Sequence, residues 1–425
     1  MRKPVNILQS LELRPFVAGF RAESAAFWFL CFYIMLEYIH PQAMYPALNF
    51  IPWGQTGILV CLASVFITNS KATGFGAMDK MFILFSILVI ISGIFAFDID
   101  TSLKYWTTFL SWMLMYFCVV SILTTPNRIL LFVLFFILIN FKLSQHGARI
   151  FTLRGFSFAR YGIAGPPGWF HNSGEFTLQM VVAFSISFSL IVALKEHIKS
   201  SLRWYILIIL FPGTAALTVI GASSRGGQIA LAIVLLIFAL TGKKFFRNLI
   251  IFSTLAFVGF HLLPEEQTSR FNTMGDDSTS QHRLTHWENA IDAIKNNPLG
   301  VGYKNWIPYY ARNYRPEIVQ EIHNSVLEVF VDLGFPGGFL FLFMVLVSFI
   351  MNARTKKEMT KIGGAEGKSL AAIATGINLG LLGTFIAALF MSVTYYPVYW
   401  LAFAMTSALR HISQYKMKEL KKTAL

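Results

Sequence analysis

The side chains best suited to chemistry gather in one polar stretch, Pro264–Asn324. Long apolar runs flank it, Leu249–Leu263 before it and Val326–Ile350 after it. The stretch contains these ionisable or aromatic candidates: Arg270, Asp276, Asp277, His282, Arg283, His286, Trp287, Lys304, Arg312, Arg315 and His323. A polar segment of this length between two hydrophobic spans is predicted to lie outside the bilayer, where its backbone can reach water. We expect this loop, with arginines from other loops on the same side, to form the active site of a membrane enzyme.

Histidines in this loop could transfer protons, because imidazole titrates near neutral pH. His323 lies where the chain returns to the membrane, and it could orient an acceptor or take its proton. It could equally be a polar cap of the helix that follows. His282 and His286 compete for the same role, and their spacing could hold a metal ion, but no third ligand is evident. We therefore predict no metal site and no cofactor.

Two aromatic segments each allow two interpretations. Gln281–Lys295 is predicted to form an amphipathic helix in which Arg283 and His286 lie beside the apolar stripe. Trp287 on that helix could contact substrate or anchor in the lipid headgroups. In the Gly- and Pro-rich stretch 162–172, Trp169 could stack on sugar faces or anchor at the membrane interface. The sequence does not separate these possibilities.

The composition is that of a membrane protein. Of 425 residues, 55% are hydrophobic and only 13% are charged, whereas soluble domains have about 25% charged residues. The net charge of +14 is explained by basic residues in cytoplasmic turns, so nucleic acid is not an expected partner. Cys31, Cys61 and Cys118 all lie in apolar runs, which predicts neither a disulfide framework nor a metal cluster.

The apolar runs predict an all-α integral membrane protein with about twelve transmembrane helices, since each run can cross about 30 Å of hydrocarbon. The runs are 23–39, 52–69, 79–97, 103–123, 128–144, 176–194, 203–222, 227–242, 247–263, 325–351, 369–393 and 396–410. The first run is interpreted as a retained helix and not as a cleaved signal peptide. Residues 1–425 are thus predicted to form one polytopic domain.

The distribution of Lys and Arg predicts the orientation of these helices. With a cytoplasmic N-terminus, the cytoplasmic segments are rich in basic residues, whereas the turns 40–51, 98–102 and 394–396 contain none. Both termini are then cytoplasmic, and the loops 264–324 and 145–175 are external, which means periplasmic in a Gram-negative cell.

The external segments nevertheless contain arginines that orientation does not require. They are Arg149, Arg154, Arg160, Arg225, Arg270, Arg283, Arg312 and Arg315. The planar fork of guanidinium donors suits phosphate oxygens, so these arginines indicate an anionic substrate, with a diphosphate the best candidate. Taken singly, Arg225 could instead extend to lipid headgroups.

Motifs across 160–345 resemble the O-antigen ligase and polymerase superfamily, often called Wzy_C. Within it, the chain is most similar to the O-glycosylation ligases associated with exosortase systems. Besides the pair Arg283 and Trp287, the motifs are PPGWFHN at 166–172, SSRGG at 223–227, SRFNT at 269–273, NNPLGVGY at 296–303 and HNSVLEVFVDLGFPGG at 323–338.

The resemblance implies a GT-C-like glycosyltransferase in the bacterial inner membrane with its active site on the periplasmic face. It implies transfer of a glycan from an undecaprenyl-diphosphate carrier to an acceptor such as lipid A-core or another glycan, with inversion and without a metal ion. In this implied site, Arg225 and Arg283 neutralise the diphosphate and His323 lies near the acceptor hydroxyl. The residues expected to bind substrate are Arg154, Arg160, Arg270, His286, Trp287, Lys304, Arg312 and Asn324. The expected partners are the lipid-linked donor, a glycolipid or glycan acceptor and membrane lipids.

Three other functions remain open. A polysaccharide polymerase or a protein O-oligosaccharyltransferase of the same superfamily would differ in its acceptor. A lipid-linked glycan transporter belongs to another class, and it would be expected to show internal repeats and matched broken helices. The sequence shows no such repeat, which favours chemistry at the membrane surface.

Overall fold

The computed structural model describes residues 13–157, 162–198, 200–241, 245–247, 249–250, 253–254, 278–315 and 319–423. These residues form helices and no strands. The helices are α1 (Leu13–Arg21), α2 (Ala25–Ile39), α3 (Pro41–Met44), α4 (Trp53–Ile67), α5 (Ala77–Ile94), α6 (Ile99–Ile122), α7 (Pro126–Leu153), α8 (Ser173–Ala193), α9 (Ser201–Ile208), α10 (Thr214–Gly221), α11 (Arg225–Thr241), α14 (Ser278–Asn296), α15 (Trp306–Tyr314), α16 (Ser325–Ile362), α17 (Gly364–Ala388) and α18 (Pro397–Thr423). The short turns η2 (Pro46–Leu48) and η3 (Lys195–His197) and the π-helical turn η4 (Ile209–Gly213) complete the set.

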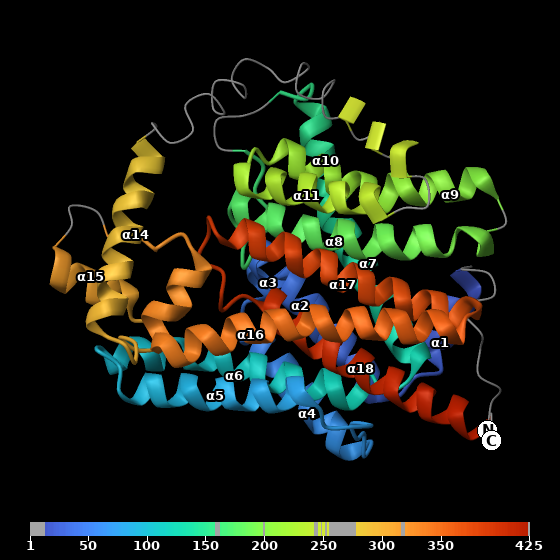
Figure 1. Ribbon diagram of the computed structural model, residues 1–425, viewed down its shortest axis with the longest axis horizontal. Helices are drawn as coiled ribbons and strands as arrows, with labels where there is room; N and C mark the ends of the chain where they lie inside the picture. The colour runs from blue at the N-terminus through green and yellow to red at the C-terminus, as the bar shows by residue number, and fades with distance from the viewer. Residues whose placement is uncertain are drawn as a thin grey trace.

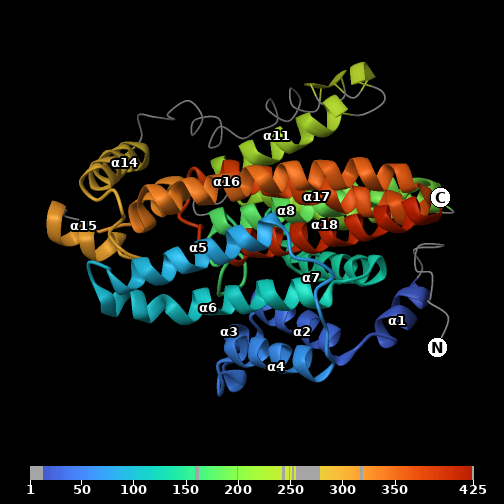
Figure 2. The ribbon, with the colours of Figure 1, turned by 60° about the horizontal axis from the view of Figure 1, so that its bottom comes forward.

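The long helices lie side by side in a bundle (Figure 1). α17 packs against α8 and α16, and α18 packs against α6. α14 and α15 lie beyond one end of the bundle, next to the start of α16, whereas α1 and the end of α18 lie at the opposite end (Figures 1 and 2).

Seven described helices are long and apolar enough to cross a membrane, or eight if the bent pair α1–α2 is one span. They are α5, α6, α7, α8, the α9–α10 segment, α16 and α17. α4 and α11 are apolar but shorter. Eleven of the predicted runs coincide with helices, and 247–263 lies largely outside the described residues. The fold is therefore helical, as expected of an integral membrane protein, and the number twelve stays a prediction.

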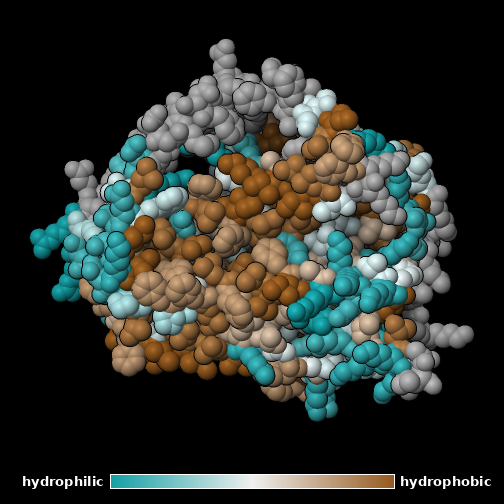
Figure 3. Space-filling model, in the orientation of Figure 1, coloured by the Kyte–Doolittle hydropathy of each residue, from teal (hydrophilic) through white to brown (hydrophobic). Residues whose placement is uncertain are grey.

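The surface supports a membrane setting. On one face, hydrophobic residues cover the middle of the bundle, and hydrophilic residues gather toward its ends (Figure 3). Outward-facing side chains of the long helices include Ile83 and Ile87 of α5 and Phe339 and Phe343 of α16, all exposed. Exposed apolar patches of this extent suit contact with lipid.

Glycines set how closely α8 and α17 approach. A Cβ on Gly376 would lie 2.8 Å from Ile186 Cα, and one on Gly383 would lie 2.4 Å from Val181 Cγ1. Small residues let helices of a membrane bundle pack backbone against backbone. The contact fixes the position of α17, whose C-terminal end leads to the site.

The segment 145–175, predicted to be a second external loop, begins with helix. α7 starts at Pro126 with Thr125 as its N-cap, a favoured arrangement, and continues to Leu153. The first residues of the predicted 145–175 loop therefore extend the preceding helix.

Candidate active site

Helix α14 confirms the predicted helix, but Leu284 and Ile291 of its predicted apolar stripe are exposed and His286 is buried. It lies beside the start of α16 (Figure 1). Trp287 Nε1 donates a hydrogen bond to Ile322 O at 3.0 Å. Trp306 Nε1, at the start of α15, donates to Gln320 O at 2.9 Å. Trp287 is thus engaged with the protein backbone.

An apolar cluster fixes α14 and α15 against α16. Ala290, Ala293, Trp306, Tyr310 and Ile322 are all buried in it. Burial of aromatic side chains of this size contributes strongly to stability, so this end of the molecule has a small core of its own.

His323 has a backbone conformation that is uncommon for a residue with a side chain. Its φ is 54°, in the left-handed region, and its N–H donates to Ser392 Oγ at 3.0 Å. Burial lowers the pKa of the His323 imidazole, and the neighbouring Arg283 and His286 lower it further, against an opposing effect of Glu328. Burial likewise lowers the pKa of His286. His323 is therefore neutral near pH 7, the state in which imidazole can accept a proton.

Arg283 is one cause of the lowered pKa of His323, because its positive charge disfavours a protonated imidazole nearby. Arg283 is partly buried on α14. His286, one turn further along α14, is buried and lies edge-on to the Tyr310 ring at 5.1 Å. These three side chains come from the long loop and meet at the start of α16.

Arg225 is the first residue of α11 and borders the turn that holds His323. Two glycines follow it. A Cβ on Gly226 would lie 3.2 Å from Phe390 Cδ2, and Phe390 lies two residues before Ser392, the partner of the His323 backbone. The close approach that Gly226 permits places the start of α11 against the 390–392 turn, and Arg225 is partly buried.

Lys304 forms an ion pair with a buried carboxylate. Its Nζ lies 2.7 Å from Glu328 Oε1, and the Glu328 side chain is 2% exposed. Burial alone would lower the pKa of Lys304, but Glu328, Glu321 and Asp332 outweigh it and raise that pKa. The Lys304 charge is thus matched by Glu328, and the pair joins the loop to α16.

Glu328 and Asp332 were not among the predicted site residues. Glu328 Oε2 accepts from Thr394 N at 3.2 Å, and Asp332 Oδ2 accepts from Lys304 N at 3.1 Å. Two carboxylates four residues apart at the start of an apolar helix are the signal that could have identified them, since acidic groups at membrane depth are expected to have partners.

The loop 296–303 packs along the kink of α16, so that two distant motifs form one unit. Val301 N donates to Val331 O at 2.8 Å, and Phe335 N donates to Pro298 O at 2.9 Å. Gly300 has φ 90° and Gly334 has φ 64°, and a Cβ on Gly334 would lie 2.4 Å from Leu299 C. Only glycine fits this crossing without strain.

The other predicted binding residues are dispersed. Asn324 caps α16, its side-chain oxygen accepting from Val326 N at 3.0 Å and Leu327 N at 3.1 Å. Arg312 lies over the Phe97 ring at 5.5 Å, and Arg154 Nη1 lies 3.5 Å from Gly162 O at the end of α7. Arg160 and Arg270 lie outside the described residues.

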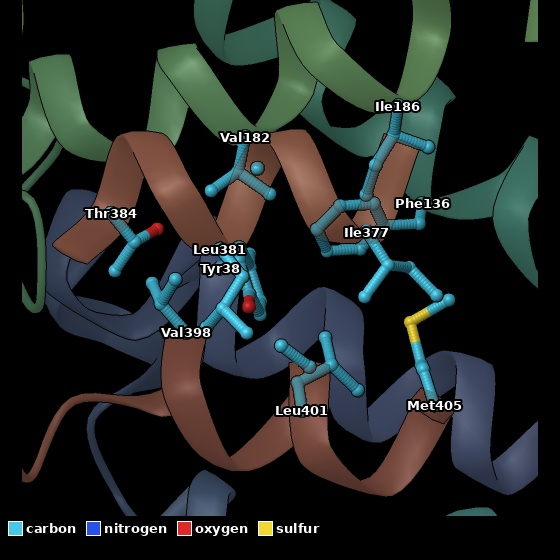
Figure 4. Close-up of a pocket in the computed structure, with 12 residues that line it drawn as sticks. Tyr38, Phe136, Val182, Ile186, Ile377, Leu381, Thr384, Val398, Leu401 and Met405 are labelled. Carbon is cyan, nitrogen blue, oxygen red and sulfur yellow. The ribbon is translucent and has the colours of Figure 1, made fainter. Parts of the chain in front are cut away.

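Among the described residues, neither a metal-binding cluster nor the small cavity of the helical core offers a further candidate site. The described residues contain no group of three His, Cys, Asp or Glu side chains that could hold a metal ion. A cavity of about 20 Å³ lies between α2, α7, α8, α17 and α18 and is lined by apolar side chains such as Ile377 and Met405 (Figure 4). It is a packing gap and is too small for a substrate.

The fold and this group of residues define a helical membrane protein with a polar site at one end of its bundle. Residues 208–342 match the family described as O-antigen ligase. The matched segment contains Arg225, Arg283 and His323 and runs from the end of α9 into α16. The match confirms the resemblance to the O-antigen ligase and polymerase superfamily.

A curated protein is also similar to this chain. It is an uncharacterized protein of Haemophilus influenzae, 26% identical over 209 residues, which cover 43% of this chain and 51% of that protein. The chain therefore matches about half the length of that relative.

Proposed function

We propose that this protein is a GT-C-like, inverting and metal-independent glycosyltransferase of the O-antigen ligase type. It transfers a glycan from an undecaprenyl-diphosphate carrier to a glycolipid or glycan acceptor. The reaction takes place on the periplasmic face of the bacterial inner membrane, with both chain termini in the cytoplasm.

One observation carries the proposal. Helix α14, which contains Arg283, donates a hydrogen bond from Trp287 Nε1 to the carbonyl of Ile322, the residue before His323, and Arg283 and His323 both belong to the segment that matches O-antigen ligase. A cation beside a proton acceptor suits a reaction that releases a diphosphate anion and a proton together. Arg225 borders the same turn through Gly226 and Phe390, which supports its place as a second diphosphate contact.

In the proposed reaction, the acceptor hydroxyl oxygen attacks the anomeric carbon on the face opposite the diphosphate. The bond from that carbon to the diphosphate oxygen breaks, and its electron pair leaves with the diphosphate. Arg225 and Arg283 neutralise the charge that develops there, an effect that is large in a poorly hydrated site. The hydroxyl proton passes to His323, and the configuration at the anomeric carbon inverts.

The test is glycan transfer by the full chain in nanodiscs, with undecaprenyl-diphosphate glycan, candidate glycolipid acceptors and EDTA. We expect Arg225→Ala, Arg283→Ala and His323→Ala each to lower the rate by about 10²–10³-fold, the usual effect of removing one preorganised charge contact. Arg354→Ala is the matched control, because Arg354 is exposed on the far part of α16, and it should keep the wild-type rate.

Other results would contradict parts of the proposal. Transfer that survives in the three folded variants would remove these residues from the site. Loss of transfer in EDTA that returns with a divalent cation would contradict the metal-independent reaction. Movement of the lipid-linked glycan across the bilayer without transfer would identify a transporter.

A further inference from the structure

A second cavity, with a polar lining, lies between α2, α4, α6 and the loop before α8. It offers about 180 Å³, far more than the roughly 10–15 Å³ that one water requires. Trp53, Trp112 and Trp169 line it, together with amide and hydroxyl side chains and the carboxylate of Glu37. None of the described residues that line it is Lys or Arg.

Glu37 is built into the wall of this cavity. Its side chain is buried, and Oε2 accepts a hydrogen bond from Trp169 Nε1 at 2.9 Å. A Cβ on Gly54 would lie 2.7 Å from the other oxygen, Oε1. Glycine at position 54 therefore lets the carboxylate pack directly against α4.

Two more polar atoms at the cavity are buried and lack hydrogen-bond partners. They are His40 Nε2 and Gln42 Oε1. Buried polar atoms usually have partners, and leaving them without one costs free energy. A bound polar molecule would remove that cost.

The lining favours one class of ligand. Sugar hydroxyls can donate to a carboxylate and exchange hydrogen bonds with amides, while the apolar face of the ring packs on indole. A phosphate would find no Lys or Arg among the described lining residues to offset its charge. An acyl chain would leave the polar atoms of Glu37, His40 and Gln42 unsatisfied.

The chain stretch 392–396 links the cavity to the candidate active site. Trp169 packs on Tyr396 with ring centres 5.0 Å apart, and Trp112 Nε1 donates to Tyr395 O at 3.0 Å. The same stretch of chain includes Ser392, which holds the backbone of His323. A glycan bound in the cavity could therefore extend toward His323.

We propose that this cavity is a saccharide subsite that binds one sugar unit of a glycan substrate, with Glu37 accepting from its hydroxyls and Trp169 packing against its ring. The inference rests on the proposed glycan transfer for the identity of the substrate. The binding itself can be measured without any transfer.

The experiment is saturation-transfer NMR on the full chain in nanodiscs, with glucose, galactose and N-acetylglucosamine as probes. At least one sugar should bind saturably in the roughly millimolar range. Glu37→Gln keeps the size of the side chain and an acceptor for Trp169 but replaces one oxygen acceptor by an amide donor, and it should weaken binding about tenfold. In Gly54→Val the new side chain would displace the Glu37 carboxylate, so this variant should abolish binding. Glu366→Gln is the control, because Glu366 is exposed on α17 and pairs with Lys416.

Absence of saturable binding by every sugar, or equal binding by all folded variants, would overturn the subsite. Displacement of the sugar by inorganic pyrophosphate alone would also overturn it. Competition by lipid-free acceptor glycan or by the lipid-linked donor supports it, and competition by neither overturns it. Sugar binding without transfer would support the subsite and contradict the proposed glycan transfer. Transfer without sugar binding would support the proposed reaction and contradict the subsite.

Discussion

His323 joins an unusual backbone conformation to surroundings that favour its neutral form. The left-handed φ at this position is maintained by the hydrogen bond to Ser392, and Arg283, His286 and burial together disfavour the imidazolium. Strained backbone that persists at a polar site is a common feature of functional residues. The electrostatic part of this arrangement can be tested without measuring catalysis.

Removing the Arg283 charge should raise the pKa of His323. The lowered pKa means that imidazole loses its proton below its usual value of about 6.5. In Arg283→Gln the NMR titration of His323 should move to higher pH, and in Arg283→Lys, which keeps the charge, it should stay near the wild-type position. A His323 titration that is identical in all three proteins would contradict the proximity of the two groups.

The Lys304–Glu328 pair should contribute to the free energy of unfolding, because its Glu328 carboxylate is buried. Glu328→Leu leaves the Lys304 cation without its partner, and we expect it to cost about 3–5 kcal/mol of unfolding free energy. Adding Lys304→Met should recover part of that loss. Chemical denaturation in detergent measures the unfolding free energy of the single and the double variant.

The matched control for this pair is the exposed Lys368–Glu196 ion pair. Glu196→Leu should change stability by about 0–1 kcal/mol, as surface pairs do. Equal effects of the Glu328 and Glu196 substitutions would mean that the Lys304 pair does not act as a buried one.

Among the helices, α16 and α17 position most of the site. α16 presents Glu328 and Asp332 and kinks at Gly334, where it receives the 296–303 loop. α17 ends just before the 390–392 turn, which contacts both His323 and the start of α11. The register of α17 against α8 therefore affects every contact at that turn.

Gly376→Ala should destabilise the bundle, because the new Cβ would lie 2.8 Å from Ile186 Cα. Overpacking of this kind costs about 1–3 kcal/mol. Gly380→Ala, about one turn along the same face, would place its Cβ at an ordinary 3.5 Å from Val182. It should be neutral or should stabilise by up to about 1 kcal/mol through helix propensity. Thermal unfolding of the two variants measures this difference in stability. A similar loss of stability in both would show that α8 and α17 do not approach as closely as the structure indicates.

The molecule as a whole is polarised along its bundle. The candidate site and α14 lie at one end, and the last turns of α18, which contain Lys418, Lys421 and Lys422, lie at the other (Figure 2). This separation agrees with the predicted orientation, in which basic residues are retained in the cytoplasm.

Cysteine labelling tests that orientation. The native Cys31, Cys61 and Cys118 are buried, so they should react little with an impermeant maleimide. Glu288→Cys, at an exposed position on α14, should be labelled in spheroplasts, whereas Lys421→Cys, exposed at the end of α18, should be labelled only after lysis. The opposite pattern would invert the topology and move the proposed site to the cytoplasm.

Much of the fold follows from local properties of the sequence. Long apolar runs must become helices in a bilayer, and the predicted runs correspond to α5, α6, α8, α16 and α17. The spacing of Trp287 and its apolar neighbours predicted the helix α14, but not its buried face, because Leu284 and Ile291 are exposed. The end of α7 was predicted less well. The predicted apolar run ends at 144, but the helix continues to Leu153 through polar residues, which hydropathy alone does not assign to a span.

The partners of the polar residues were decided by tertiary structure. Sequence identified Lys304, Asn324 and Trp287 as candidates for substrate contact, but folding pairs Lys304 with Glu328, makes Asn324 a helix cap and directs Trp287 to the Ile322 carbonyl. Each partner depends on how the loop 296–303, α14 and the start of α16 cross. The types and periodicity of neighbouring residues determined which segments became helices, whereas contacts between distant segments determined which charges are compensated and which could act on a substrate.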